Sequence, residues 1–257
     1  MGKLIRMDLY RMVKAKSFLI CLILAFVLAL SGAPLSRLMV TLFASLSPDI
    51  TETFIPEVQL SSFFKNSFPA LQFMLMLLSL CFFFYADVEN GYIKNIAGQM
   101  PMKGFTILSK FIAAFVHNIV FAAVGIIGSL IGALIVQKIN VDGGALLDSF
   151  RVLALKLLLA QGICAILLLV VSTFRSKSLG VTLAVLYGLG LTSLIYLGIN
   201  EGLQHIFGKG TDISKIMPDT VMNKEPLDTW KAIAVAVGAS VVFLVPAIRI
   251  FDRKDVK

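Results

Sequence analysis

Six long apolar runs, separated by polar segments, are the dominant pattern of the chain. They cover residues 17–36, 68–86, 111–136, 157–174, 179–199 and 232–248, and none of them contains Asp, Glu, Lys or Arg. A helix needs about 20 apolar residues to cross the hydrocarbon core of a bilayer, and only helices or closed barrels satisfy their backbone hydrogen bonds in lipid. The pattern therefore predicts an all-α integral membrane protein, with residues 1–257 forming a single transmembrane domain of six helices.

The composition of the chain supports this class. Hydrophobic residues make up 58% of the chain and charged residues 15%, whereas soluble domains contain about 45–50% and about 25%. Each of the three cysteines lies in an apolar run, and no Cys-x-x-Cys pair occurs. We therefore expect neither a disulfide framework nor a metal site.

The distribution of basic residues predicts the orientation of the chain. With the N-terminus inside, the inner segments hold 14 basic and 5 acidic residues, and the outer segments hold 9 basic and 10 acidic residues. Cytoplasmic segments of membrane proteins carry an excess of Lys and Arg. We therefore predict that both termini are cytoplasmic. We also predict that the net charge of +8 serves to interact with anionic lipid of the inner leaflet rather than with nucleic acid.

Residues 1–16 precede the first apolar run and have an amphipathic pattern. Leu4, Ile5, Leu9, Met12 and Val13 can share one helical face, which favours a short helix lying in the membrane interface. A cleavable signal peptide is the alternative, because a basic region and an apolar run precede the small residues around Ala29.

The apolar runs offer little chemistry. Their conspicuous polar residues are Gln72, His117, Asn118 and Gln161, and we expect no charged group inside the bundle. Ion-coupled transporters usually keep ionisable residues at this depth, and proteolysis needs an activated nucleophile or paired acids. The glycines and lysine of 202–210 have the wrong spacing for a phosphate loop. We therefore expect that the chain is not an enzyme, binds no cofactor and cannot hydrolyse ATP by itself.

The inner segment between the second and third runs, 87–110, carries the strongest positive signal. Ile93, Ile96, Ala97 and Met100 recur at helical spacing, which predicts a short amphipathic helix, and Pro101 would end it. Such a helix could transmit a push from a cytoplasmic partner, or it could simply cover the ends of the two spans. The spacing alone does not separate these alternatives.

The residues of this segment carry a resemblance to a known family. The order Glu89-x-Gly91-x-Ile93-Lys94, followed by Pro101 and Lys110, resembles the coupling-helix loop of type-two ATP-binding-cassette (ABC) transporter permeases. In those permeases the glycine usually follows the glutamate by three positions and precedes a threonine, whereas here it follows by two and precedes Tyr92. The short chain is similar to bacterial permeases for bacitracin resistance, lantibiotic immunity and cytolytic-peptide export.

The resemblance implies a partner and roles for single residues. It implies a homodimer in the bacterial cell membrane, joined to two copies of a cytosolic ABC ATPase that bind ATP and Mg. It assigns coupling to the ATPase to Glu89, Gly91, Ile93, Lys94 and Pro101. Pro218, in the outer loop before the last span, would belong to an external gate.

Small and soft residues give further expectations. The fifth run contains the small residues Gly180, Gly188 and Gly190, which suit close helix packing within the chain or at a dimer interface. Phe and Met crowd the second run, which would suit an amphipathic peptide as substrate or would simply face lipid. Export of a lipid or small hydrophobic compound is an alternative, as is a membrane immunity or scaffold protein that transports nothing.

Overall fold

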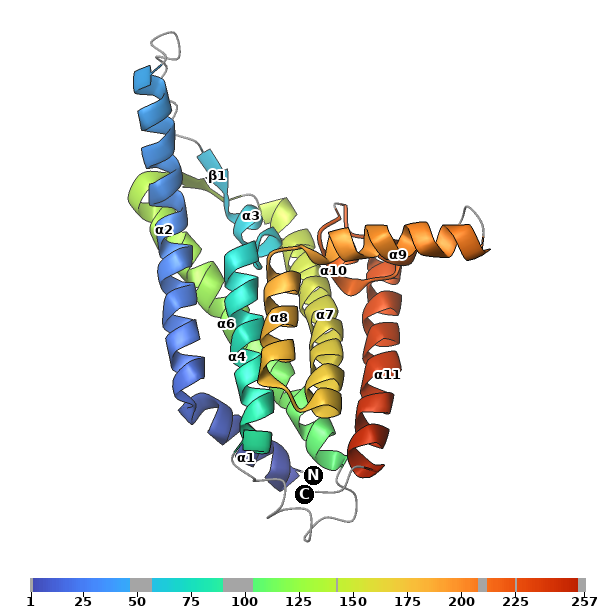
Figure 1. The fold of residues 1–257 in the computed structure, drawn as a ribbon. Helices are drawn as coiled ribbons and strands as arrows, with labels where there is room; N and C mark the ends of the chain where they lie inside the picture. The colour runs from blue at the N-terminus through green and yellow to red at the C-terminus, as the bar shows by residue number, and fades with distance from the viewer. Residues whose placement is uncertain are drawn as a thin grey trace.

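The computed structural model describes residues 2–46, 57–89, 104–141, 143–207, 212–224 and 226–253. Five helical segments are long and apolar enough to cross a membrane, and they stand side by side in Figure 1. They are α2 (Lys16–Leu46), α4 (Ala70–Glu89) with the short α3 (Leu60–Lys65) before it, α6 (Phe105–Val136), α7 (Gly143–Phe174) and α11 (Thr229–Arg253). The predicted spans 17–36, 68–86, 111–136, 157–174 and 232–248 fall within these segments.

The remaining elements lie at the two ends of the bundle (Figure 1). The helix α1 (Gly2–Lys14) lies across one end, near the last residues of α4 and α11 and the first residues of α6. The other end carries α3, α9 (Thr192–Phe207), η1 (Ile213–Lys215) and α10 (Pro218–Met222). It also carries β1 (Glu57–Gln59) and β2 (Lys138–Asn140), which pair in parallel. The placement of both described chain ends at one end of the bundle agrees with the predicted topology; which side is cytoplasmic stays a prediction.

The core forms around α7. Leu159, Ile163 and Leu167 of this helix are completely or almost completely buried, as are Met76 and Leu80 of α4. The helix α7 packs against α11, α6, α4 and α8 (Lys177–Gly188). Because α7 is covered on several sides, the apolar residues that face lipid come mainly from other helices, including Ile20 and Ile23 of α2.

The predicted fifth span, 179–199, is wrong as a continuous helix. The chain bends by 92° between α8 and α9, and α9 leaves the bundle sideways in Figure 1. Gly190 has φ +72°, and the Leu191 amide bonds the carbonyl of Leu186 while the Gly190 amide bonds that of Tyr187. This is the hydrogen-bond pattern of a glycine-terminated helix. With 12 residues, α8 rises only about 18 Å.

Gly180 and Gly188, the other two glycines expected to pack closely, lie against α4 of the same chain. A Cβ at Gly180 would meet the sulfur of Cys81, and a Cβ at Gly188 would overlap the backbone and side chain of Met74. The α2–α6 contact has the same character, since Gly128 faces Ala29 and Gly132 faces the carbonyl of Leu30. Close backbone approach at small residues is a main source of helix association in lipid.

We predict that Gly188→Ala destabilises the chain. The added methyl group would meet the Met74 backbone, which cannot move away cheaply, and such overpacking costs about 1–3 kcal/mol. Gly198→Ala is the matched control, because no atom lies within 4 Å of a Cβ there and alanine favours a helix. Thermal unfolding in detergent should show a lower Tm for Gly188→Ala alone. Equal Tm values for both variants would contradict the close α4–α8 packing.

Candidate functional site

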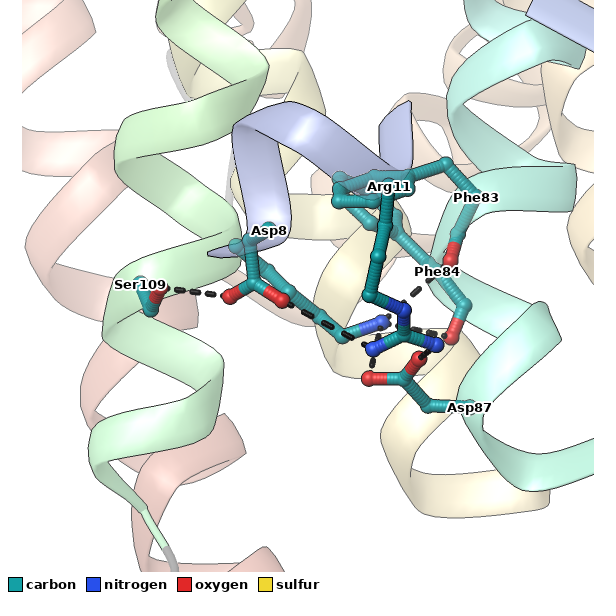
Figure 2. Close-up of polar contacts among 7 residues, drawn as sticks. Asp8, Arg11, Phe83, Phe84, Asp87 and Ser109 are labelled. Atoms are coloured by element: carbon teal, nitrogen blue, oxygen red, sulfur yellow. Dashed lines mark hydrogen bonds and ion pairs between the residues drawn. The ribbon is translucent and has the colours of Figure 1, made fainter. Parts of the chain in front are cut away.

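Four charged side chains meet where α1 crosses the ends of α4 and α6 (Figure 2). Asp8 and Arg11 come from α1, Asp87 from the last turn of α4, and Lys110 from the second turn of α6. The Asp8 and Asp87 side chains are 0% and 1% exposed, Lys110 is 4% exposed and Arg11 is 26% exposed. We call these four residues the charge cluster.

Asp87 is the centre of the charge cluster. One of its carboxylate oxygens lies 2.5 Å from Nη2 of Arg11, and the other lies 2.9 Å from Nζ of Lys110. Arg11 also approaches Asp8, with 3.8 Å between Nη1 and Oδ1. The cluster therefore alternates acid and base across three helices, and its formal charges cancel.

The Lys110 ammonium has partners in addition to Asp87. It donates hydrogen bonds to the main-chain carbonyls of Phe83 at 3.3 Å and Phe84 at 3.2 Å. It also lies 4.9 Å from the centre of the Phe83 ring, close enough for a cation–π contact. The ammonium is therefore attached to the end of α4 by two hydrogen bonds and one ion pair.

Asp8 joins α1 to α6 by a direct hydrogen bond. The hydroxyl of Ser109 donates to Oδ2 of Asp8 at 2.5 Å. Burial raises the pKa of Asp8 above its ordinary value, although the Ser109 hydrogen bond and the Lys110 charge act in the opposite direction. The ionised form of Asp8 is therefore held in the fold at a cost.

The charge cluster overturns the expectation that no charged group lies inside the bundle. The helices extend beyond the apolar runs, so that Asp87 and Lys110 lie on ordered turns of α4 and α6, and α1 lies beside them (Figure 2). Asp8, the single acid among residues 1–16, was a signal that the apolar-run analysis did not use. It lies three positions before Arg11, a spacing that places both on one helix face.

The charge cluster fixes both ends of the segment that links α4 to α6. Asp87 lies two residues before the end of α4, and Lys110 lies five residues after the start of α6. The amide of Gly104, just before α6, donates to Oδ1 of Asp252 near the end of α11 at 2.5 Å. Glu89 ends α4 and is exposed. The other coupling candidates, Gly91, Ile93, Lys94 and Pro101, lie outside the described residues.

Pro218, the predicted gate residue, begins α10 at the opposite end and is buried. Its neighbour Asp219 is also buried, and it accepts hydrogen bonds from the Thr192 hydroxyl at 2.5 Å and the Tyr196 hydroxyl at 3.1 Å. Tyr196 is in turn 3.4 Å from the Tyr187 hydroxyl of α8. The sequence analysis also missed Asp219, and this buried acid ties α8, α9 and α10 together.

The mid-bundle polar residues bond one another or the backbone. Gln72 donates to the carbonyl of Phe121 at 3.0 Å, and the Asn118 amide donates to Gln161 at 3.2 Å. His117 Nε2 and the Ser79 hydroxyl are 3.1 Å apart. Among the described residues no group of three or more His, Cys, Asp or Glu side chains could hold a metal ion. These polar residues brace α4, α6 and α7 against one another.

We predict that Asp87→Asn destabilises the fold strongly. It leaves the charges of Arg11 and Lys110 without their shared carboxylate, and removing one partner of a buried ion pair costs about 3–5 kcal/mol. Lys215→Gln, which breaks an exposed pair with Asp212, is the control and should cost about 0–1 kcal/mol. Chemical unfolding would measure both. In the double variant with Lys110→Met, the loss should be smaller than the sum of the two single losses; strict additivity would contradict the pairing.

We predict a pH-dependent effect for Asp8→Asn. Because the folded pKa of Asp8 lies above its ordinary value of 3.8, the folded chain keeps this proton to a higher pH than the unfolded chain, and stability falls as pH rises through the folded pKa. Asparagine does not ionise. The Tm of Asp8→Asn, relative to that of the original chain, should therefore rise as the pH increases from about 4 toward neutrality. A difference that stays constant over this range would contradict the raised pKa.

Comparison with known proteins places the chain in a family. The model of the ABC-2 family transporter proteins matches residues 4–190. The match spans more than half of the chain, includes all four residues of the charge cluster, and ends at the glycine that separates α8 from α9. Neither the curated proteins nor the solved structures contained a significant match. The chain belongs to the ABC-2 family of transporter proteins, as a multi-pass membrane permease that works with an ABC ATPase.

Proposed function

We propose that this permease exports amphipathic peptides, and that its ATPase drives it by pushing on the segment between α4 and α6. The permease would act as a homodimer with two copies of a cytosolic ATPase. The observation that carries the proposal is the charge cluster, which joins both ends of that segment to α1 by buried ion pairs. A force applied to residues 90–103 would then reach three helices at once.

Rigid contacts make this transmission efficient. Lys110 bonds Asp87 and two carbonyls of α4, so the ends of α4 and α6 cannot separate without exposing a buried charge. Ser109 and Asp8 extend the connection to α1, and Gly104 extends it to α11 through Asp252. Because a buried charge is costly to unpair, these helix ends should move as one body.

The opposite end of the bundle would respond by opening. There the buried Asp219 holds Thr192 and Tyr196 of α9 against α10, and Pro218 packs near Gly162 of α7. Movement of α7 relative to α11 would disturb this packing. We therefore assign the external gate to α9, η1 and α10, with Pro218 at its inner edge.

The substrate class rests on an apolar cavity beside Pro218. It has a volume of about 360 Å³ and is lined by residues 216–218 and by α11 residues that include Val235, Ala239 and Val242. Such a surface suits the apolar side chains of an amphipathic peptide. The Phe and Met residues of the second run support the proposal less, because Phe73, Met76 and others of them are buried in the core of the chain.

Export of a lipid or a small hydrophobic compound is the second candidate. The same cavity favours it, because the residues that line it carry no charged side chain and would accept an acyl chain equally well. The two candidates share the ATPase partner and differ in which substrate stimulates ATP hydrolysis.

We predict that Glu89→Ala and Gly91→Pro uncouple the ATPase from the permease. In vesicles containing both proteins, an amphipathic peptide should stimulate ATP hydrolysis, and each variant should lower this stimulation by about tenfold, within the range of a lost coupling free energy of 1–3 kcal/mol. Glu57→Ala is the matched control, since Glu57 is an exposed glutamate of β1 at the opposite end and lies outside the proposed gate. Its stimulation should stay unchanged.

The outcomes of this experiment separate the candidates. Stimulation by lipid but not by peptide would replace the first substrate class with the second. Failure of the chain to bind or stimulate an ATPase would support a scaffold or immunity protein instead. Full stimulation in both Glu89→Ala and Gly91→Pro would show that force enters the bundle elsewhere.

A further inference from the structure

A basic cavity lies at the end of the bundle opposite the charge cluster. It has a volume of about 350 Å³ and lies between the C-terminal end of α3, the first turns of α7 and the residues that precede α11. Its lining residues are Lys65, Asp148, Arg151, Val152, Lys156, Pro226 and Leu227. Three of the nine basic residues predicted on the outer side therefore converge on one cavity.

The cavity is built on one face of α7. Asp148, Arg151, Val152 and Lys156 follow one another at helical spacing, so all four point to the same side. Val152 and Leu227 are 7% and 6% exposed and form an apolar floor. The Lys156 ammonium donates to the main-chain carbonyl of Lys65 at 2.5 Å, which holds a positive charge beside the end of α3.

Among the described residues that line the cavity, Asp148 is the one carboxylate, and two of the cations share it. Asp148 lies 3.2 Å from Nη2 of Arg151 and 3.8 Å from Nζ of Lys65. Around this carboxylate, the two positive charges of Lys65 and Arg151 therefore face one negative charge. Arg151 and Lys65 are 54% and 36% exposed, so both can turn toward a ligand. A guanidinium next to ammonium groups is the arrangement that binds phosphate oxygens.

Exposed apolar side chains border the cavity. Phe150, next to Arg151, is 51% exposed, and Leu147 is 83% exposed. The Phe150 ring packs against Phe64 of α3 at 4.6 Å. Trp230, at the start of α11, is 82% exposed. Tryptophan is enriched where a membrane meets water, which supports a position for the cavity at the level of the lipid head groups.

We propose that this cavity binds the phosphate head group of an anionic phospholipid. Lys65 and Arg151 would contact the phosphate, and Leu147 and Phe150 would lie along the acyl chains. The proposal commits to a membrane lipid because the positive charge and the exposed apolar side chains lie next to each other, which matches an amphiphile and not a free ion. It does not depend on which substrate the permease exports.

The test compares lipids on the full chain purified in detergent. Phosphatidylglycerol should raise the Tm and phosphatidylcholine should not, because a ligand that binds the folded state stabilises it. Arg151→Gln and Lys65→Gln should each lose at least half of the shift produced by phosphatidylglycerol, and the double variant should lose all of it. Lys231→Gln, an exposed charge at the same end that does not line the cavity, should keep the full shift.

Native mass spectrometry gives a second measurement that does not depend on unfolding. The original chain and Lys231→Gln should retain a bound phosphatidylglycerol that the double variant loses. Equal lipid retention or an equal Tm shift in the double variant would overturn the proposal. So would an equal loss in Lys231→Gln, which would indicate a general charge effect, or an equal Tm shift with inorganic phosphate, which would indicate a free ion as the ligand.

Discussion

The pairing of Asp87 with Lys110 and Arg11 is the interaction on which the rest of this structure depends. Charges removed from water must find partners, and here each partner comes from a different helix. Lys110 also donates hydrogen bonds to two main-chain carbonyls of α4, and Ser109 donates one to Asp8 of α1. Breaking one pair leaves an uncompensated buried charge, so the pairing works as a constraint on movement as much as a source of stability. It holds α1, α4 and α6 together at the end of the bundle where the linking segment is attached.

Elsewhere the helices are joined by contacts that allow close approach. Gly128 and Gly132 bring α6 against the backbone of α2, and Gly188 brings α8 against α4. Lipid tails are as apolar as the helix surfaces, so the hydrophobic effect does not drive one helix against another in the membrane. Close backbone packing and interhelical hydrogen bonds determine which helices meet. The family resemblance and the matched family model agree that such a bundle serves as a transporter permease. Two of the buried acids, Asp87 and Asp219, lie at opposite ends, one at the proposed entry of force and one at the proposed gate.

Apolar run length predicted five of the spans well, because a run free of charges and about 20 residues long has one stable conformation in a bilayer. It failed at the fifth span, where hydropathy does not register that Gly190 ends a helix and that Thr192, Tyr196 and Asn200 form a polar face that needs partners. It also missed the charge cluster, since Asp87 and Lys110 lie just beyond the apolar runs and hydropathy does not show that α1, α7 and α11 pack around them. Of the predicted coupling residues, the structure describes Glu89, and the roles of all five stay predictions.

The most direct test of the account is the amount of substrate exported for each ATP hydrolysed, measured in vesicles for Arg11→Gln. Arg11 is the most exposed member of the charge cluster, so its replacement should leave the complex assembled and the ATPase active. If the cluster transmits force, ATP hydrolysis should continue while substrate export falls. An unchanged ratio of export to hydrolysis would show that α1 and its ion pairs stabilise the bundle without driving it.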